Sequence, residues 1–331
     1  MANADLQTRV GVVAVSSVVP LVELGMGVEA LRAAGLSVTV HPGVGNEHFT
    51  LAGDDTQRLE AFWEYACRDD LDVLWMARGG YGATRILPTL ERLTLEKGTP
   101  PKKLLVGYSD VTALHEFVHS RWGWPTLHAP MPAASNFGSL PKAEWDAIIA
   151  YVTTGKAQPL WQNTQLKFIA NHPSNDITGK LSGGNLTVWN CLSGTPFAAA
   201  EAGGRILFFE DIGEAPYRID RMLTQFVQSG GLRGVKAVIF GDLTHCSDEA
   251  QEVMADRTGG KRPLRRVYST ADALQVIVQQ TLAREGVVVA TGLPVGHGPN
   301  FSPLPLNADY TLTRGGKLVM ADWGWAGVAQ A

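Results

Sequence analysis

The sequence predicts an α/β protein of two domains, the first built on a parallel sheet. The chain has 331 residues, and single hydrophobic cores stop growing at roughly 250 to 300 residues, so two domains are expected. From Arg9 to about Pro130, short β-branched runs alternate with amphipathic segments. This alternation is typical of a parallel sheet that is covered by helices on both faces.

The expected elements of the first domain can be placed in order. Strands are predicted at 10–16, 37–41, 72–77, 104–106 and 125–128, with helices through 30–34, 56–68, 83–90 and 111–122. Sites in such sheets lie beyond the carboxyl ends of the strands. Two turns follow strands and should share that edge: Ala77-Arg78-Gly79-Gly80-Tyr81-Gly82 and Gly107-Tyr108-Ser109-Asp110.

The periodicity weakens between Glu144 and Gly179, where the chain becomes polar and carries several Gly, Pro and Asn residues. We therefore predict a first domain over 1–150, a linker over 151–178 and a second α/β domain over 179–331. In the second domain, strands are expected at 205–209, 236–240 and 287–290, with helices through 219–227 and 271–283. A basic stretch, Arg257 to Arg266, is expected to be a solvated loop.

Composition limits the function classes. The net charge is -4, from 28 basic and 32 acidic residues, which gives no electrostatic case for nucleic acid or an anionic membrane. The three cysteines lie far apart without C-x-x-C spacing, so a reducing compartment is expected. Met1 to Arg9 is polar, and no apolar stretch approaches the roughly 18 residues of a membrane span. The sequence is that expected of a soluble cytoplasmic protein.

Ser109 is a candidate nucleophile. It stands at a tight turn between an apolar run, Leu104 to Val106, and a helical segment. A serine on such a turn is lifted clear of its neighbours, and the first backbone N–H groups of the helix can receive an oxyanion. The ordinary alternative is a helix N-cap.

A serine nucleophile needs a base and an orienting carboxylate. His297 follows the expected strand 287–290 and has glycines on both sides. Glu210 and Asp211 end the apolar strand 205–209. Side chains of a strand alternate between faces, so only one of these two acids can face a given site, and the pattern leaves the choice open. The order nucleophile, acid, histidine matches α/β-hydrolases, but Val111 replaces the second glycine of their G-x-S-x-G turn.

Two rival motifs are present. His115-Glu116-Phe117-Val118-His119 fits H-E-x-x-H, so His115 and His119 could bind zinc with Glu116 as general base. No third histidine follows at the required spacing; Glu144 is the only obvious further ligand. Gly25-Met26-Gly27-Val28-Glu29-Ala30 fits a dinucleotide fingerprint, but it lies too far past the first strand, and no acid ends the second.

Six segments together resemble the successive motifs of the serine LD-carboxypeptidases, in the family's order and over most of the chain. They are Arg78-Gly79-Gly80-Tyr81-Gly82, Gly107-Tyr108-Ser109-Asp110-Val111-Thr112-Ala113-Leu114, Gly183-Gly184-Asn185-Leu186, Phe209-Glu210-Asp211-Ile212-Gly213-Glu214, Pro216-Tyr217-Arg218-Ile219-Asp220-Arg221-Met222-Leu223 and Pro294-Val295-Gly296-His297-Gly298. The related microcin-immunity peptidases share the scaffold, but the first two segments are closer to the carboxypeptidase branch.

The resemblance implies a triad of Ser109, Glu210 and His297, and so chooses Glu210 over Asp211. It implies an oxyanion hole made by the backbone N–H groups of Gly80 and Asp110. The implied fold is a Rossmann or flavodoxin-like domain plus a mixed α/β domain of swivelling type, with the active site between them. The implied assembly is a homodimer.

The implied activity releases terminal D-Ala from a murein tetrapeptide, without metal or other cofactor, as part of peptidoglycan recycling. A free carboxylate on the leaving group calls for a cation, and Arg78 and Arg218 are the candidates, with Asn185 as a further substrate-binding residue. Three alternatives remain: microcin-type hydrolysis of a peptide or aminoacyl-nucleotide amide on the same triad, a zinc hydrolase using His115 and His119, and a non-enzymatic sugar- or peptide-binding module.

Overall fold

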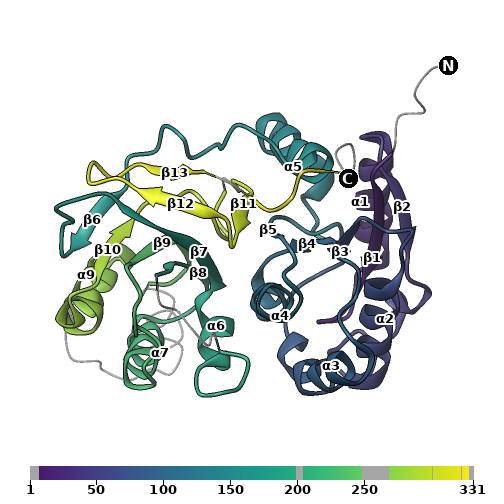
Figure 1. Cartoon of the computed structure of the whole chain (residues 1–331), viewed down its shortest axis with the longest axis horizontal. Helices are drawn as coiled ribbons and strands as arrows, with labels where there is room; N and C mark the ends of the chain where they lie inside the picture. The colour runs from purple at the N-terminus through teal and green to yellow at the C-terminus, as the bar shows by residue number, and fades with distance from the viewer. Residues whose placement is uncertain (1–6, 199–203, 248–267, 300, 322, 328–331) are drawn as a thin grey trace, which may run out of the picture. The chain divides into compact units, whose positions relative to one another are not determined.

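The computed structural model describes residues 7–198, 204–247, 268–299, 301–321 and 323–327. The chain divides into two compact units (Figure 1). The first comprises 1–162, 302–309 and 320–331, and the second comprises 163–301 and 310–319. The basic stretch Arg257 to Arg266 lies outside the described residues. No helix in the described part of the chain is both long and apolar enough to cross a membrane.

The first unit is a parallel sheet with helices on both faces, as the alternating pattern predicts. Its described residues form β1 (Arg9–Val13), α1 (Leu21–Ala33), β2 (Ser37–Val40), η1 (Pro42–Gly45), α2 (Asp55–Cys67), β3 (Val73–Met76), α3 (Ala83–Lys97), β4 (Leu104–Gly107), η2 (Ser109–Val111), α4 (Thr112–Trp122), β5 (Thr126–His128), η3 (Phe137–Ser139), α5 (Lys142–Thr154) and β11 (Leu304–Leu306).

The strand order of this sheet is β11-β5-β4-β3-β1-β2, which contains the flavodoxin-type order 2-1-3-4-5. The pairs from β2 to β5 are parallel, and β11 adds an antiparallel edge strand beside β5. Helix α1 lies on one face of this sheet, and α2, α3 and α4 lie on the other (Figure 1). The central strands β3 and β4 are wholly buried, as expected of parallel strands covered on both sides.

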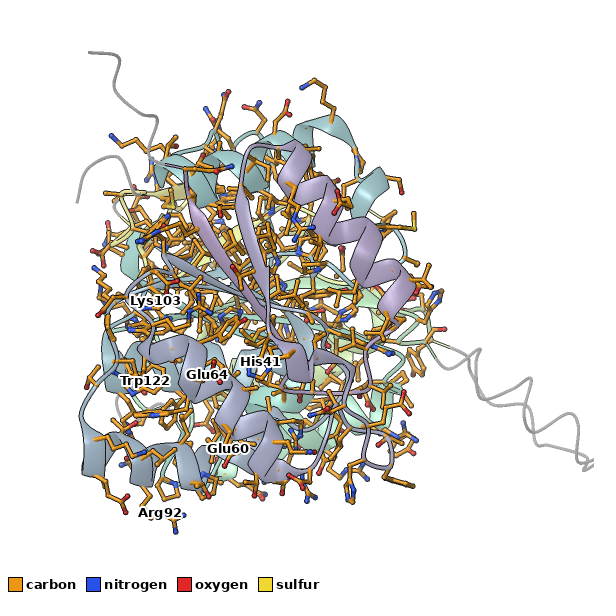
Figure 2. The ribbon with its side chains drawn as sticks, turned by 90° about the vertical axis from the view of Figure 1, so that its right-hand side faces the viewer. His41, Glu60, Glu64, Arg92, Lys103 and Trp122 are labelled. Atoms are coloured by element: carbon orange, nitrogen blue, oxygen red, sulfur yellow. The ribbon has the colours of Figure 1, made fainter. Side chains whose placement is uncertain are left out.

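Aromatic packing joins the helices of one face. Trp122, at the end of α4, stacks on Phe62 of α2 with ring centroids 5.9 Å apart, and it meets Trp63 edge-on at 6.1 Å. Figure 2 shows this side of the unit, where the charged side chains of Glu60 and Glu64 on α2 lie in solvent. The amphipathic pattern that predicts α2 thus separates an aromatic contact from a charged outer surface.

The second unit is a mixed sheet with helices along one side (Figure 1). Its described residues form β6 (Lys167–Ala170), β7 (Ile177–Asn185), α6 (Leu186–Leu192), β8 (Ile206–Ile212), α7 (Pro216–Gln228), β9 (Ala237–Thr244), α9 (Thr270–Gln280), η4 (Leu282–Glu285), β10 (Val288–Thr291), β12 (Asp309–Leu312) and β13 (Leu318–Met320). The strand order is β13-β12-β7-β8-β9-β10-β6.

Within this sheet, β7, β8, β9 and β10 run parallel, and β6 pairs antiparallel with β10. The core beneath it includes Phe209 and Phe240 from the strands and Phe226 from α7. Buried aromatic side chains of this size dominate the energetics of a core. They fix α7 against the strands that carry the acidic residues discussed below.

The units differ from the expected domain boundaries in several places. Residues 151–162 of the predicted linker, and residues 302–309 and 320–331 of the predicted second domain, belong to the first unit, and the rest of the linker belongs to the second. Part of the predicted linker, Lys167–Ala170, is strand β6 of the second sheet. The segment 302–309, expected in the second domain, belongs to the first unit, where β11 pairs with β5. Both strands depend on partners far along the chain, so local composition carries little signal of them.

Candidate active site

Ser109 lies on a strained turn directly after β4. Its φ is 60°, a region that costs a residue with a side chain about 1–2 kcal/mol. Val111 N donates to Tyr108 O at 3.2 Å, which closes the turn before α4 begins. A serine with positive φ between a strand and a helix has the backbone of a nucleophile turn. The candidate nucleophile therefore has the local geometry that the sequence predicts for it.

The glycine turn 79–82 lies against Ser109. A Cβ on Gly79 would stand 3.2 Å from Ser109 Cβ and 3.4 Å from its Oγ. Gly80 has φ 106°, and a Cβ there would collide with Ser17 Oγ. Ser17 also holds the turn by hydrogen bonds, with its N donating to Gly79 O at 3.3 Å and its Oγ accepting from Tyr81 N at 3.2 Å. Glycine is thus required for the backbone of this turn to approach its neighbours closely.

Glu210 and His297 form a hydrogen-bonded pair in the second unit. His297 Nδ1 lies 2.6 Å from Glu210 Oε2. Glu210 sits near the end of β8 and is fully buried, whereas the His297 side chain is 13% exposed. A Cβ on Gly296 would lie only 2.9 Å from Glu210 Cβ, so this glycine lets the histidine loop approach the carboxylate. With Nδ1–H donating to the carboxylate, Nε2 carries the lone pair of the neutral ring.

The environment of the pair shifts its protonation. Burial alone would lower the pKa of His297, but the hydrogen bond to Glu210 and the charges of Glu210, Asp211 and Asp242 raise it above its ordinary value. Burial raises the pKa of Glu210, and the hydrogen bond with His297 opposes that rise. A carboxylate that holds Nδ1–H and favours the imidazolium is the orienting partner that a histidine base needs.

Asp242 is a neighbour of His297 that the sequence analysis did not identify. It follows the buried part of β9, and its N donates to Val295 O at 2.9 Å. Burial raises the pKa of its half-buried carboxyl, which accepts a hydrogen bond from the Gly298 backbone. Asp242 therefore holds both sides of the histidine loop. The available signal was its position just beyond the strand predicted at 236–240.

Asp211 shares Asn185 with Glu210 but does not meet His297 in the same way. Its carboxylate accepts from Asn185 Nδ2 at 3.0 Å, from Thr187 N at 2.9 Å and Oγ1 at 2.8 Å, and from its own neighbour Ile212 N at 2.8 Å. Glu210 thus meets His297, whereas Asp211 fixes the connection from β7 to α6.

Asn185 acts within this local structure. Its Oδ1 accepts from Val188 N at 3.1 Å as the N-cap of α6, and the residue is 5% exposed. Arg78 is exposed, and its Nη1 donates to Val18 O at 2.6 Å. Arg218 is also exposed, lies on α7, and pairs with Glu214 at 3.4 Å. Of the three predicted substrate-binding residues, the two arginines present accessible side chains and Asn185 is largely covered.

The two histidines of the H-E-x-x-H motif serve the fold. His115 is 1% exposed and its Nε2 lies 2.9 Å from Gly107 O, at the end of β4. Burial lowers the pKa of His115 to about 4, and the hydrogen bond to Gly107 O opposes that shift. His119 Nδ1 lies 3.4 Å from Trp124 O. Among the described residues, no group of three or more His, Cys, Asp and Glu side chains could hold a metal ion. This arrangement disfavours the zinc alternative.

The dinucleotide-like segment is also structural. Gly25 and Gly27 lie inside α1 rather than at its start, and a Cβ on Gly27 would overlap the backbone of Pro132. A phosphate-binding glycine turn must precede the helix N-terminus. Gly27 is therefore a helix-packing residue.

Comparison with known proteins identifies the family. Residues 10–129 match the LD-carboxypeptidase N-terminal domain, and residues 178–312 match the LD-carboxypeptidase C-terminal domain. The chain belongs to this family, and it is a serine-type carboxypeptidase.

One curated relative and two solved structures match this chain over most of its length. The murein tetrapeptide carboxypeptidase of Pseudomonas aeruginosa is 28% identical over 293 residues, which cover 88% of each chain. The crystal structure of muramoyltetrapeptide carboxypeptidase from Oxalobacter formigenes matches with a TM-score of 0.73 and 27% identity, over 97% of this chain and 100% of that one. The structure of the microcin immunity protein MccF with glutamyl sulfamoyl guanosine has the same fold, with a TM-score of 0.73, 19% identity and 97% of each chain covered.

Proposed function

We propose that this protein hydrolyses the amide bond between the L-centre of diaminopimelate and the terminal D-Ala of a murein tetrapeptide. The observation that carries the proposal is the buried Glu210–His297 pair, at 2.6 Å, in a chain of the LD-carboxypeptidase family. The strained turn at Ser109 supports the third member of a Ser-His-Glu triad.

In this mechanism Ser109 Oγ attacks the scissile carbonyl while its proton passes to His297 Nε2. The backbone N–H groups of Gly80 and Asp110 receive the oxyanion of the tetrahedral intermediate. Collapse of that intermediate breaks the C–N bond, and the amine of D-Ala leaves with the proton from His297. A water molecule, activated by the same histidine, then hydrolyses the acyl-enzyme and restores Ser109. Glu210 holds the ring and stabilises the imidazolium in both halves of the cycle.

The substrate carries a free carboxylate on its leaving amino acid. Arg78 and Arg218 are exposed and are the proposed cations for it. Asn185 remains a weaker substrate-binding candidate because its side-chain amide is used by Asp211 and by the N-terminus of α6. We further propose a cytoplasmic homodimer that acts in peptidoglycan recycling without a metal or other cofactor, with neither nucleic acid nor a membrane as partner.

A second candidate is hydrolysis of an aminoacyl-nucleotide amide on the same triad. It is favoured by the fold shared with MccF, whose structures hold glutamyl sulfamoyl guanosine and aspartyl sulfamoyl adenosine. Hydrolysis of a murein tetrapeptide is the preferred function, because the relative named for that activity aligns over more of this chain, and at higher identity, than the microcin immunity protein does.

The test is direct incubation with purified murein tetrapeptide, with released D-Ala measured by mass spectrometry. We expect stoichiometric conversion to the tripeptide by the wild type and none above background by Ser109→Ala. An aminoacyl sulfamoyl adenosine serves as the parallel substrate. Release of the amino acid from that compound alone would favour the second candidate, and hydrolysis of neither would overturn both.

A further inference from the structure

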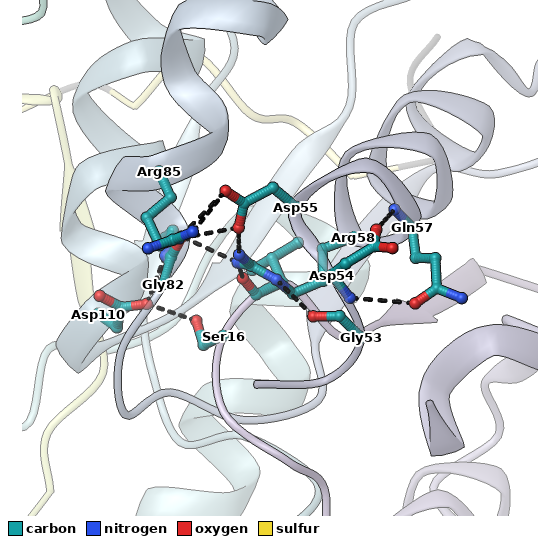
Figure 3. A network of polar contacts seen from close by, with 11 residues as sticks. Ser16, Gly53, Asp54, Asp55, Gln57, Arg58, Gly82, Arg85 and Asp110 are labelled. Carbon is teal, nitrogen blue, oxygen red and sulfur yellow. Dashed lines mark hydrogen bonds and ion pairs between the residues drawn. The ribbon is translucent and has the colours of Figure 1, made fainter. Parts of the chain in front are cut away.

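The side chain of Asp110 joins the two backbone segments of the proposed oxyanion hole. Asp110 follows the nucleophile, and its own N–H is one proposed donor. Its carboxylate is buried, with the residue 2% exposed, and Oδ2 accepts from Ala83 N at 2.8 Å, just after the glycine turn that supplies the other donor. The same oxygen accepts from Ser16 Oγ at 2.6 Å, which ties it to the segment that follows β1 (Figure 3).

Arg58 holds the same turn from the opposite side. It lies on α2, which Asp54 and Gln57 start with a reciprocal capping box, and its side chain is fully buried. Nη1 donates to Gly82 O at 2.9 Å and to Val15 O at 2.5 Å, and Nε donates to Gly53 O at 3.3 Å (Figure 3). One rigid, planar guanidinium thus binds three carbonyl groups from three separate segments.

The contact leaves no room for a side chain on the turn. A Cβ on Gly82 would lie 2.7 Å from Arg58 Nη1, and Gly82 has φ 128°. A buried guanidinium is costly unless its donors are satisfied. Here Nε and Nη1 donate to backbone carbonyls, and only Nη2 pairs with a side chain, the partly exposed Asp55. The main effect of the cation is therefore to fix the backbone.

Asp55 closes the network at its outer edge. Its carboxylate pairs with Arg58 Nη2. It also accepts hydrogen bonds from Arg85, from Nε to Oδ1 and from Nη2 to Oδ2, both at 2.8 Å (Figure 3). The Arg85 side chain is 47% exposed. Arg85 therefore shares the network but is an exposed branch of it, which makes it a matched control.

We propose that Arg58 and the Asp110 carboxylate are positioning residues that fix the spacing of the two oxyanion donors, Gly80 N–H and Asp110 N–H. The inference rests on the proposed function, because it assigns a role to groups that act only if Ser109 is the nucleophile. Neither side chain is expected to touch substrate. Each acts through the backbone of the glycine turn.

If an oxyanion donor is misplaced by a fraction of an ångström, the enzyme stabilises the transition state less well but still binds substrate. Removing a whole oxyanion donor costs about 10²–10³ in kcat. A loosened donor should cost less, about 10- to 100-fold in kcat, with KM changed by less than about threefold. A purely structural role would instead lower the melting temperature and the amount of active enzyme while leaving kcat per active site unchanged.

The experiment compares Arg58→Lys, Asp110→Asn and Ser16→Ala with the control Arg85→Gln. Active sites are titrated with an alkyl fluorophosphonate, which phosphonylates the serine with loss of fluoride, and the label is located by mass spectrometry. For each variant we measure the phosphonylation rate, kcat and KM on murein tetrapeptide, and the melting temperature.

We expect the phosphonylation rate and kcat to fall together in the first three variants and to stay within about twofold of wild type in Arg85→Gln. If Arg58→Lys does not fold, Ser16→Ala still tests the inference, because it removes only one hydroxyl from the Asp110 carboxylate. Folded variants with wild-type phosphonylation rate and kcat overturn the inference while leaving the proposed function intact. A wild type that is neither labelled at Ser109 nor active overturns the proposed function, and the inference falls with it.

Discussion

His297 Nδ1 lies 2.6 Å from the fully buried carboxylate of Glu210. The two residues are 87 positions apart in the chain, and the glycine at 296 allows the close approach. Because the carboxylate favours the imidazolium and burial opposes it, the pair sets the pH range in which His297 can act as a base.

The pH profile should reflect this balance. His297 must be neutral to accept the serine proton, so kcat/KM should rise as pH increases through its folded pKa. That pKa is raised above the ordinary 6.5, and the acid limb should therefore have its midpoint above 6.5. The measurement is kcat/KM on murein tetrapeptide as a function of pH. A midpoint clearly below 6.5 would contradict the role assigned to the pair.

Glu210→Gln keeps the size of the side chain and removes its charge. We expect kcat to fall by about 10⁴, as for loss of the charge at the analogous position of a serine-protease triad. Any residual activity should show its acid limb at lower pH than wild type, because burial then acts on His297 without the opposing carboxylate. Residual activity with an unchanged midpoint would remove Glu210 from the triad.

Asp211→Asn is the matched comparison and should affect stability more than chemistry. Its carboxylate accepts hydrogen bonds from Asn185, Thr187 and Ile212, and an amide has only one oxygen to accept them. The expected loss is about 1–3 kcal/mol in the free energy of unfolding, measured by urea denaturation, with kcat lowered far less than in Glu210→Gln. The reverse ranking of the two variants in kcat would mean that Asp211 is the acid of the triad.

The strained backbone at Ser109 gives a stability prediction that is independent of any substrate. Ser109→Gly and Ser109→Ala should both lose nearly all turnover, since neither has a nucleophile. Because φ is 60° there, glycine should relieve strain that alanine retains, and Ser109→Gly should be the more stable variant by about 1 kcal/mol. Thermal unfolding of the two variants measures the difference. Equal stability would indicate that the turn relaxes in solution.

The cation for the terminal carboxylate can be identified by paired substrates. Arg78→Met and Arg218→Met each retain an unbranched apolar stem, shorter than that of arginine, and remove the charge. The residue that binds the carboxylate should, when replaced, lower kcat/KM for the free acid by about 10- to 100-fold, consistent with loss of a charge-assisted hydrogen bond. The corresponding terminal amide should be affected little. An arginine whose loss affects both substrates equally has a structural role, such as the contact of Arg78 with Val18 O.

Chelation tests the remaining histidine motif. The ring of His115 is buried against Gly107 O, so it is not available to a metal ion from solvent. Dialysis against a strong chelator should leave kcat unchanged, and His119→Ala should retain activity within about threefold of wild type. Activity that disappears on dialysis and returns with added zinc would restore the zinc reading of this motif.

Much of the first unit could be predicted from sequence because its signals are local. Buried β-branched runs and amphipathic segments alternate along the chain, and the sharp turn at Ser109 follows from a strand, a glycine and a helix in succession. The same local pattern located Glu210, Asp211 and His297 near strand ends. The family resemblance then chose Glu210, and the hydrogen bond to His297 agrees with that choice.

The short or peripheral strands were not predictable in this way. β6 and β11 have 4 and 3 residues, and each exists because it pairs with a strand more than a hundred residues away. Unlike the equally short β4 and β5, neither is set between helices along the chain, so its three or four residues carry too little pattern to separate a strand from a loop. These two segments are among the places where the expected linker and domain boundaries differ from the two units.

The sequence by itself determined the succession of strands and helices and the residues that stand at their ends. Only the tertiary structure decided which residues contact one another. Asp242 binds the loop of His297, Asp211 accepts hydrogen bonds at the start of α6, and Arg58 donates to the glycine turn. The physical reason is that periodicity records which face of an element is buried, whereas a hydrogen bond between distant residues depends on the register and packing of the elements that carry them.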